Sequence, residues 1–205
     1  MSKKSSTMKF IALIFLEGDT EKEFADKLFP KYLDKTPRKV MNLHGNININ
    51  NKIFDKVANF ISNNADTLVR VYCFIDREHR THNPPLDIAF IKSEFKAKSV
   101  FQGRVISTHR IVATQMIESW FFYDIEGIYK FLSVPHKNRD NSKYKPPEKF
   151  TANDLARLFS RYGKSYIKGK RCANLIEHLD TDKIYKQCTE LRAGLDIIRG
   201  KKKTV

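Results

Sequence analysis

Acidic residues follow two apolar segments of this chain, and four of them could together hold a cation. They are Glu17, Glu21, Asp76 and Glu78. Carboxylates brought to one place repel one another unless a cation lies between them. Oxygen ligands of this kind favour Mg²⁺ or Mn²⁺, so the set predicts a magnesium or manganese site. For Asp76 the alternative is an ordinary ion pair with Arg77 or Arg80.

Glu17 is the member of this set that a structural role explains least. Acids in the first turn of a helix interact favourably with the helix dipole, which accounts for Glu21 without any function. Glu17 instead follows seven apolar residues, 10–16, and precedes Gly18. A glycine there permits a tight turn from strand to helix and a close approach of the backbone to a ligand. Glu17 therefore requires an explanation beyond local structure.

The first half of the chain alternates strand-like and helix-like segments. Strands separated by single helices favour parallel pairing through right-handed crossovers. We therefore predict an α/β fold with an open, mostly parallel sheet flanked by helices, in which ligands gather beyond the carboxyl ends of the strands. Thr20 and Glu23 fit a capping box that opens the first helix. The expected strands are residues 10–16, 40–43, 68–75 and 105–107, and the expected helices are residues 20–33, 53–61 and 88–95.

The second half has a helical pattern. A chain of 205 residues supports one sizeable core rather than two. We therefore divide it into an α/β core, residues 1–112, and a basic helical extension, residues 113–205, packed on that core. Residues 135–150 are polar, basic and contain prolines, which is typical of a mobile loop. The expected helices of the extension are residues 116–122, 125–132, 152–162, 173–179 and 184–198.

The positive charge is concentrated in one stretch of the extension. The whole chain carries a net charge of +15, and residues 136–171 contain eleven Lys or Arg and three Asp or Glu, a net of +8. Such a stretch attracts phosphate backbones through counterion release. A charged surface that only keeps the protein soluble is an equal alternative. The candidate nucleic-acid contacts are Lys143, Lys145, Arg161, Lys164, Lys168, Lys170 and Arg171.

Composition argues against membrane and disulfide-rich classes of protein. No apolar run approaches the roughly 18 residues that span a bilayer. The lysines before residue 10 suggest a signal peptide, but the apolar run is short and ends at Glu17, where a small-residue cleavage site would be needed. Three cysteines without a CxxC pairing are typical of reduced thiols. We expect a cytoplasmic protein with no membrane partner.

Two sets of motifs resemble known families. EGDTE at residues 17–21, with DRE at 76–78, resembles the Toprim domain of topoisomerases, primases and OLD-type (overcoming-lysogenization-defect) nucleases, over roughly residues 9–110. QMIESWFFYD at residues 115–124 and YIKGKR at 166–171 resemble a bacterial Toprim-like family of unknown function that is often found beside AAA or ABC-type ATPases in defence loci.

The Toprim resemblance implies roles for the first set of acids. Glu17 would be the Toprim glutamate, serving as a metal ligand or general base. Glu21 would be the second acid of the EGxxE pattern of OLD-type nucleases. Asp76 would be the first metal-binding aspartate of a DxD pair. Position 78 departs from that pair, because it is Glu rather than Asp.

The helical half adds three candidates. Glu118 and Asp124 would be ligands of a second metal by the resemblance to the Toprim-like family of unknown function. For Glu118, a structural acid paired with an arginine is an equal alternative, because a buried carboxylate needs a partner. Lys168 could neutralise charge on the reacting phosphate or on the leaving oxygen. The alternative for Lys168 is a simple contact to the phosphate backbone.

These observations predict a metal-dependent Toprim-type endonuclease that hydrolyses DNA or RNA with Mg²⁺ or Mn²⁺, with Glu17, Asp76 and Lys168 as its catalytic residues. The resemblance further implies an effector of anti-phage defence that works with a partner ATPase. The alternative is a non-catalytic Toprim-like module that binds nucleic acid or that ATPase. A phosphoacceptor receiver domain fits less well, because it needs adjacent acids after its first strand and a lysine after a fifth strand.

Overall fold

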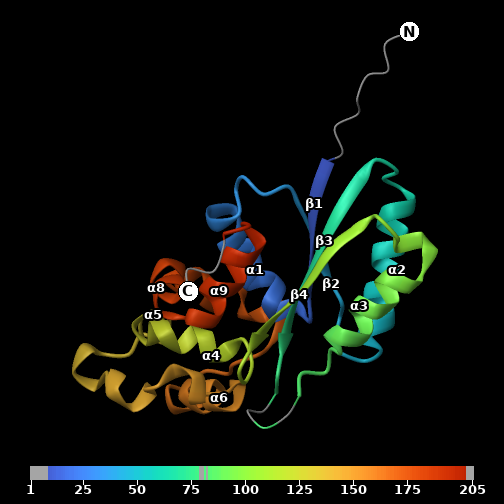
Figure 1. Cartoon of the computed structure of the whole chain (residues 1–205). Coiled ribbons are helices and arrows are strands. Elements are labelled where there is room, and N and C mark those ends of the chain that lie inside the picture. The colour runs from blue at the N-terminus through green and yellow to red at the C-terminus, as the bar shows by residue number, and fades with distance from the viewer. Residues whose placement is uncertain (1–8, 79–80, 82, 202–205) are drawn as a thin grey trace.

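The computed structural model describes residues 9–78, 81 and 83–201. Within these residues, four parallel strands form a sheet in the order β2-β1-β3-β4 (Figure 1). This architecture confirms the predicted α/β class with an open parallel sheet. The fourth strand continues well past residue 107, its predicted end. The strands are β1 (Lys9–Leu16), β2 (Arg38–Asn42), β3 (Thr67–Asp76) and β4 (Val105–Ala113).

Helices cover both faces of the sheet. Figure 1 shows α2 and α3 on one face, and α1 with the helical second half of the chain on the other. The helices of the first half are α1 (Asp19–Tyr32), α2 (Ile49–Ser62) and α3 (Ile88–Ala97). Those of the second half are α4 (Glu118–Phe121), α5 (Ile125–Phe131), α6 (Ala152–Arg161), α7 (Ala173–His178), α8 (Thr181–Gln187) and α9 (Thr189–Ile198).

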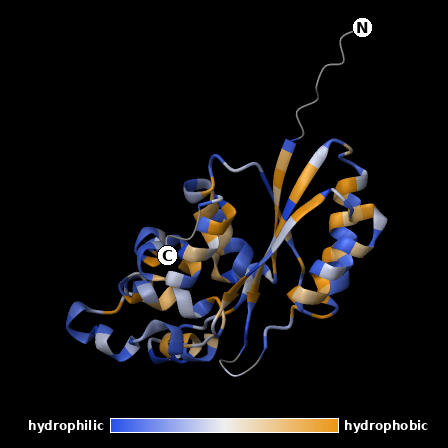
Figure 2. Cartoon of the chain, in the orientation of Figure 1, coloured by the Kyte–Doolittle hydropathy of each residue, from blue (hydrophilic) through white to orange (hydrophobic). Residues whose placement is uncertain are grey.

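Burial on both faces explains why β1 is apolar from Ala12 to Leu16. Leu13 and Phe15 pack in the cluster that includes α2 and α3. Ile14 and Leu16 alternate with them and pack in the cluster that includes α1 and the helices after residue 116. Figure 2 shows apolar residues along the central strands. The helical half therefore shares a core with the sheet, and residue 112 marks a change of architecture rather than the edge of a separate core.

The predicted helix at 184–198 is wrong in one respect, because two helices occupy this stretch. Helix α8 ends before Cys188, whose backbone is extended, with φ −79° and ψ 103°. The thiol of Cys188 then accepts a hydrogen bond from the N–H of Leu191 at 3.5 Å, which caps α9. Apolar periodicity continues through Ile184, Leu191 and Leu195. The sequence pattern therefore gives no sign of the break.

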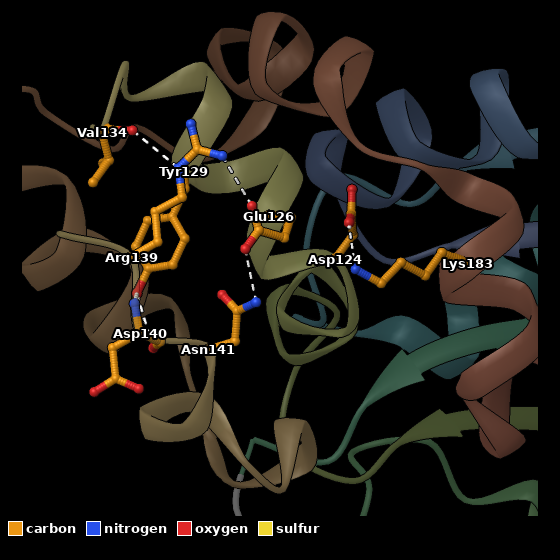
Figure 3. A network of polar contacts seen from close by, with 8 residues as sticks. All are labelled: Asp124, Glu126, Tyr129, Val134, Arg139, Asp140, Asn141 and Lys183. Atoms are coloured by element: carbon orange, nitrogen blue, oxygen red, sulfur yellow. Dashed lines mark hydrogen bonds and ion pairs between the residues drawn. The ribbon is translucent and has the colours of Figure 1, made fainter. Parts of the chain in front are cut away.

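The predicted mobile loop at residues 135–150 is instead a series of short 3₁₀ turns anchored on α5 (Figure 3). Glu126 accepts hydrogen bonds from Arg139 at 3.0 Å and from Asn141 at 2.7 Å. The hydroxyl of Tyr129 donates to the carbonyl of Asp140 at 3.0 Å. These partners lie on a helix that precedes the loop, so its polar composition alone could not reveal them.

Candidate metal centre

A polar pocket of about 340 Å³ opens at the carboxyl ends of β1 and β3. We call it the acidic pocket. The topology of the sheet creates it, because β1 and β3 are neighbours and end at the same edge. Helix α4 and the segment around residue 168 complete its walls. The acidic pocket brings together five of the six predicted metal ligands, Glu17, Glu21, Asp76, Glu78 and Glu118, with the predicted catalytic lysine, Lys168.

Glu17 is fixed at the floor of the acidic pocket by its neighbours. Its carbonyl accepts a hydrogen bond from the N–H of Gly45 at 2.7 Å. Its carboxylate accepts one from the N–H of Asp76 at 3.2 Å, which ties the ends of β1 and β3 together. Burial raises the pKa of Glu17, and the N–H of Asp76 only partly opposes that rise.

Asp76 is held from the opposite side. Its Oδ1 accepts a hydrogen bond from the backbone N–H of Ile117 at 3.0 Å, just before α4. Burial raises its pKa well above the ordinary value, and repulsion from Glu21 and Glu118 adds to the rise. The described charges that shift Asp76 most are thus acids rather than a basic partner. Of the two alternative partners named from the sequence, Arg80 lies outside the described residues.

Glu118 carries the clearest sign of a ligand. Its side chain is 1% exposed. Its Oε1 accepts a hydrogen bond from the hydroxyl of Tyr166 at 3.0 Å and lies 3.5 Å from the ammonium of Lys168. Its Oε2 is buried and has no hydrogen-bond partner among the described residues. A buried carboxylate oxygen is costly to leave unpaired, so this atom points to a cation or donor that arrives from outside the chain.

Positive charge in the acidic pocket is scarce. Burial opposes the charge on Lys168, but Glu118 and Asp76 outweigh it and raise the pKa of Lys168. Burial also raises the pKa of Glu21 to about 7, with further contributions from Glu118 and Glu17. One lysine therefore shares the pocket with six acidic residues, the five named above and Asp19. Within the described residues, no three acidic, histidine or cysteine side chains already form a metal-ligand group.

Glu78 differs from the other four acids. It is exposed at the rim of the acidic pocket, and its backbone lies in the left-handed region with φ 67°. That conformation is uncommon for a residue with a side chain. The N–H of Glu78 donates to the carbonyl of Gln115 at 2.7 Å, which holds it there. The hard oxygens of this set, with the unpaired oxygen of Glu118, fit Mg²⁺ or Mn²⁺ better than a softer metal.

Asp124, the sixth predicted metal ligand, lies outside the acidic pocket. Asp124 pairs with Lys183 at 3.0 Å and accepts a hydrogen bond from the N–H of Asp180 at 2.8 Å, away from the acidic pocket (Figure 3). Residues three or four apart share a helix face. Asp124 is six residues beyond Glu118 and therefore points elsewhere. Its role is a structural ion pair.

The tight packing around Asp124 gives a prediction about stability. A methyl group at Gly127 would lie 2.9 Å from the carbonyl of His178 and still closer to the carboxylate of Asp124. We expect Gly127→Ala to lower the free energy of unfolding by about 3 kcal/mol, the upper part of the range for overpacking. Urea unfolding measures it. Gly18→Ala is the matched control, because its methyl would meet only the Glu21 carboxylate at 3.1 Å. Equal losses in both variants would contradict this account.

The predicted nucleic-acid contacts fall into two groups. Lys164, Lys168, Lys170 and Arg171 follow one another along the segment that borders the acidic pocket. The others lie in or beside the anchored loop. Lys143 pairs with Asp140 at 3.5 Å, and Lys145 lines a separate, mostly apolar cavity of about 610 Å³. Arg161 is the last residue of α6, and its charge partly opposes the rise that burial causes in the pKa of Tyr144.

Three residues of the site were missed by reasoning from the sequence. Tyr166 holds Glu118, although its motif was noted only for Lys168. Thr20, predicted as a helix cap, instead accepts a hydrogen bond from the N–H of Gly169 at 2.8 Å and so fixes the turn beside Lys168. Glu190 accepts hydrogen bonds from the N–H of Thr114 at 3.2 Å and the indole of Trp120 at 3.1 Å. It therefore fixes the chain on both sides of Glu118.

Comparisons with known proteins add one finding. A protein-family model described as "Domain of unknown function (DUF4276)" matches residues 16–198. This range includes every residue of the acidic pocket named above. No curated protein and no solved structure matches the chain.

Proposed function

We propose that this chain, which belongs to the DUF4276 family, is a metal-dependent nuclease that hydrolyses phosphodiester bonds in DNA or RNA. The observation that carries the proposal is the unpartnered, buried Oε2 of Glu118 in a pocket shared with five further acidic residues and one lysine. Acids that are buried together repel one another, which costs free energy even in a chain of net charge +15. A bound cation offsets that cost. The basic surface beside the pocket suits a polyanionic substrate.

Each side chain of the acidic pocket has a role in this proposal. Glu17, Glu21, Asp76 and Glu118 would hold Mg²⁺ or Mn²⁺, with Glu78 contributing from the rim. A divalent cation, when bound, activates water and stabilises charge on the departing oxygen. Tyr166 orients Glu118 through its hydrogen bond at 3.0 Å. Glu17, whose pKa burial raises, could also serve as a general base.

Lys168 has the role of a fixed positive charge beside the reacting phosphate. It lies 3.5 Å from Oε1 of Glu118, and Gly169 behind it is anchored to Thr20. A preorganised cation there would stabilise charge that develops on phosphate oxygens. The ammonium of Lys168 also remains protonated over the pH range of the proposed reaction, because the neighbouring acids raise its pKa.

Cleavage assays test the proposal. Purified protein with Mn²⁺ or Mg²⁺ should cleave plasmid DNA, single-stranded DNA or tRNA, and EDTA should stop it. Lys168→Met should lower the cleavage rate by about 10²–10³-fold with little loss of binding, since removing one such stabilising donor costs about that much. Lys170→Met is the matched control and should change the rate far less. If both variants weaken binding and cleavage to the same degree, Lys168 is only a backbone contact.

A non-catalytic nucleic-acid-binding module is the second candidate. The observation that favours it is that no three ligand side chains converge among the described residues. This candidate predicts binding that is indifferent to EDTA and to Glu17→Ala, with no cleavage of any substrate. A metal-dependent cleavage lost in Glu17→Ala would exclude it.

Two further proposals concern the setting of the protein. The resemblance of EGDTE and YIKGKR to families in defence loci supports a role in anti-phage defence beside a partner ATPase. A cytoplasmic location is supported by the cysteines Cys73, Cys172 and Cys188, which are buried and unpaired. No helix in the described part of the chain combines the length and apolar character needed to cross a membrane.

A further inference from the structure

A second cavity lies beside the acidic pocket. It has a volume of about 310 Å³ and is lined by the rings of Phe131, Phe159 and Tyr166 and by the polar side chains of Lys164, Arg171 and Asn174. We call it the aromatic pocket. Its volume is at the lower end of the range for small-molecule sites, which is about 300–1,000 Å³. It therefore suits one planar ring system rather than a large ligand.

Tyr166 lines the aromatic pocket and contacts a residue of the acidic pocket. Its ring packs edge-on against Phe159 in the aromatic pocket, with ring centroids 5.4 Å apart. Its hydroxyl reaches Glu118 of the acidic pocket at 3.0 Å. Lys168 stands only two residues further along the chain, and two extended residues span at most about 7 Å. A ring in the aromatic pocket and a phosphate beside Lys168 would therefore belong to the same nucleotide or to adjacent ones.

The edge of the aromatic pocket is cationic. Lys164 donates to the carbonyl of Phe131 at 2.7 Å, and its ammonium lies 4.8 Å from the centre of the Phe131 ring, so its position is fixed. Arg171 is exposed on the same edge. Ile167 also lines the aromatic pocket and is 43% exposed, an apolar side chain between Lys164 and Lys168 in the sequence. Aromatic surfaces interleaved with positive charge are the arrangement that binds single-stranded nucleic acid.

We infer that the aromatic pocket receives an unpaired base of the strand whose phosphate reaches the acidic pocket, so that the substrate class is single-stranded nucleic acid. This inference rests on the proposed function. A base of a duplex would have to leave its stack to enter, at a cost of a few kcal/mol, whereas a single strand offers bases at little cost. Stacking on aromatic rings is tolerant of base identity, so we expect little sequence preference.

The test measures binding rather than cleavage. Fluorescence anisotropy in EDTA compares labelled single-stranded DNA and RNA oligonucleotides of about a dozen nucleotides with duplexes of the same sequence. Wild-type protein should prefer the single strands. Asn174→Trp, which fills the mouth of the aromatic pocket without changing charge, should weaken single-strand binding between about fivefold and a hundredfold, the worth of one stacked base. Duplex binding should not change.

Two controls keep the result interpretable. Asn153→Trp adds the same ring at an exposed position of α6 outside the aromatic pocket and should bind as the wild type does. Lys137→Glu changes charge elsewhere in the basic stretch and should weaken single strands and duplexes alike. The inference is overturned if Asn174→Trp binds single strands normally, or if it weakens duplexes to the same extent. Because EDTA removes the metal, a protein that cleaves nothing can still pass this test, and a nuclease that cleaves duplexes can still fail it.

Discussion

Replacing Asp76 by asparagine should abolish metal-dependent cleavage and, at the same time, make the metal-free protein more stable. The amide keeps an oxygen that can accept the hydrogen bond from Ile117, so the end of β3 remains in place. It removes a buried negative charge, 7% exposed, whose pKa is raised by burial and by repulsion from Glu21 and Glu118. Stability gained where function is lost is the expected signature of a site built from repelling charges.

The loss of activity in Asp76→Asn should be at least about a hundredfold, because the loss of an outer partner of a metal ligand alone costs about 10–100-fold. Cleavage with Mn²⁺ at pH 8 and thermal melting in EDTA measure the two effects. Asp124→Asn is the matched control: it weakens the ion pair with Lys183 at 3.0 Å. It should lower the melting temperature and leave cleavage intact below that temperature. An Asp76→Asn protein that cleaves normally, or melts lower than wild type in EDTA, would refute this account.

The sequence was most informative where the topology of a parallel sheet decides the outcome. Glu17 and Asp76 follow apolar strands, and strands that pair in parallel bring such residues to one edge. Glu118 could be selected as a candidate because it interrupts an apolar helix face. Its role could not be decided from the sequence, since a metal ligand and a structural acid have the same sequence pattern. Its position, with one oxygen on Tyr166 and the other unpaired, supports the proposed role as a ligand.

Contacts between distant segments could not be predicted in this way. Thr20 has the local pattern of a helix cap, yet its hydroxyl accepts a hydrogen bond from the N–H of Gly169. Glu190 lies 70 residues beyond Trp120, and nothing in the sequence pairs them. Asp124 lies outside the acidic pocket for a related reason. Its partner, Lys183, comes from α8, so a motif that contains both Glu118 and Asp124 does not bring them into one pocket. Local pattern identifies candidates, and long-range packing selects among them.

The acidic pocket should also make the stability of the metal-free protein fall as pH rises, and this is the second large effect we expect. Burial and neighbouring acids raise the pKa of Glu21 from 4.5 to about 7. Between these values the folded protein binds more protons than the unfolded chain, so the free energy of unfolding decreases with pH. The loss develops between pH 4.5 and about 7 and is complete above that range. It amounts to about 3 kcal/mol at pH 8.

Mg²⁺ or Mn²⁺ should reverse this loss over the same pH range, because carboxylates bind the cation only when ionised. Melting temperatures at pH 5 and pH 8, in EDTA and with either metal, measure both trends. A change of about 3 kcal/mol corresponds to roughly 6–12 °C for a chain of this size. Glu21→Gln is the control. Subtracting its melting temperatures from those of the wild type leaves the contribution of Glu21 and removes that of the overall positive charge. Stabilisation by metal that is equal at both pH values, or equal in Glu21→Gln, would place the cation elsewhere than among these acids.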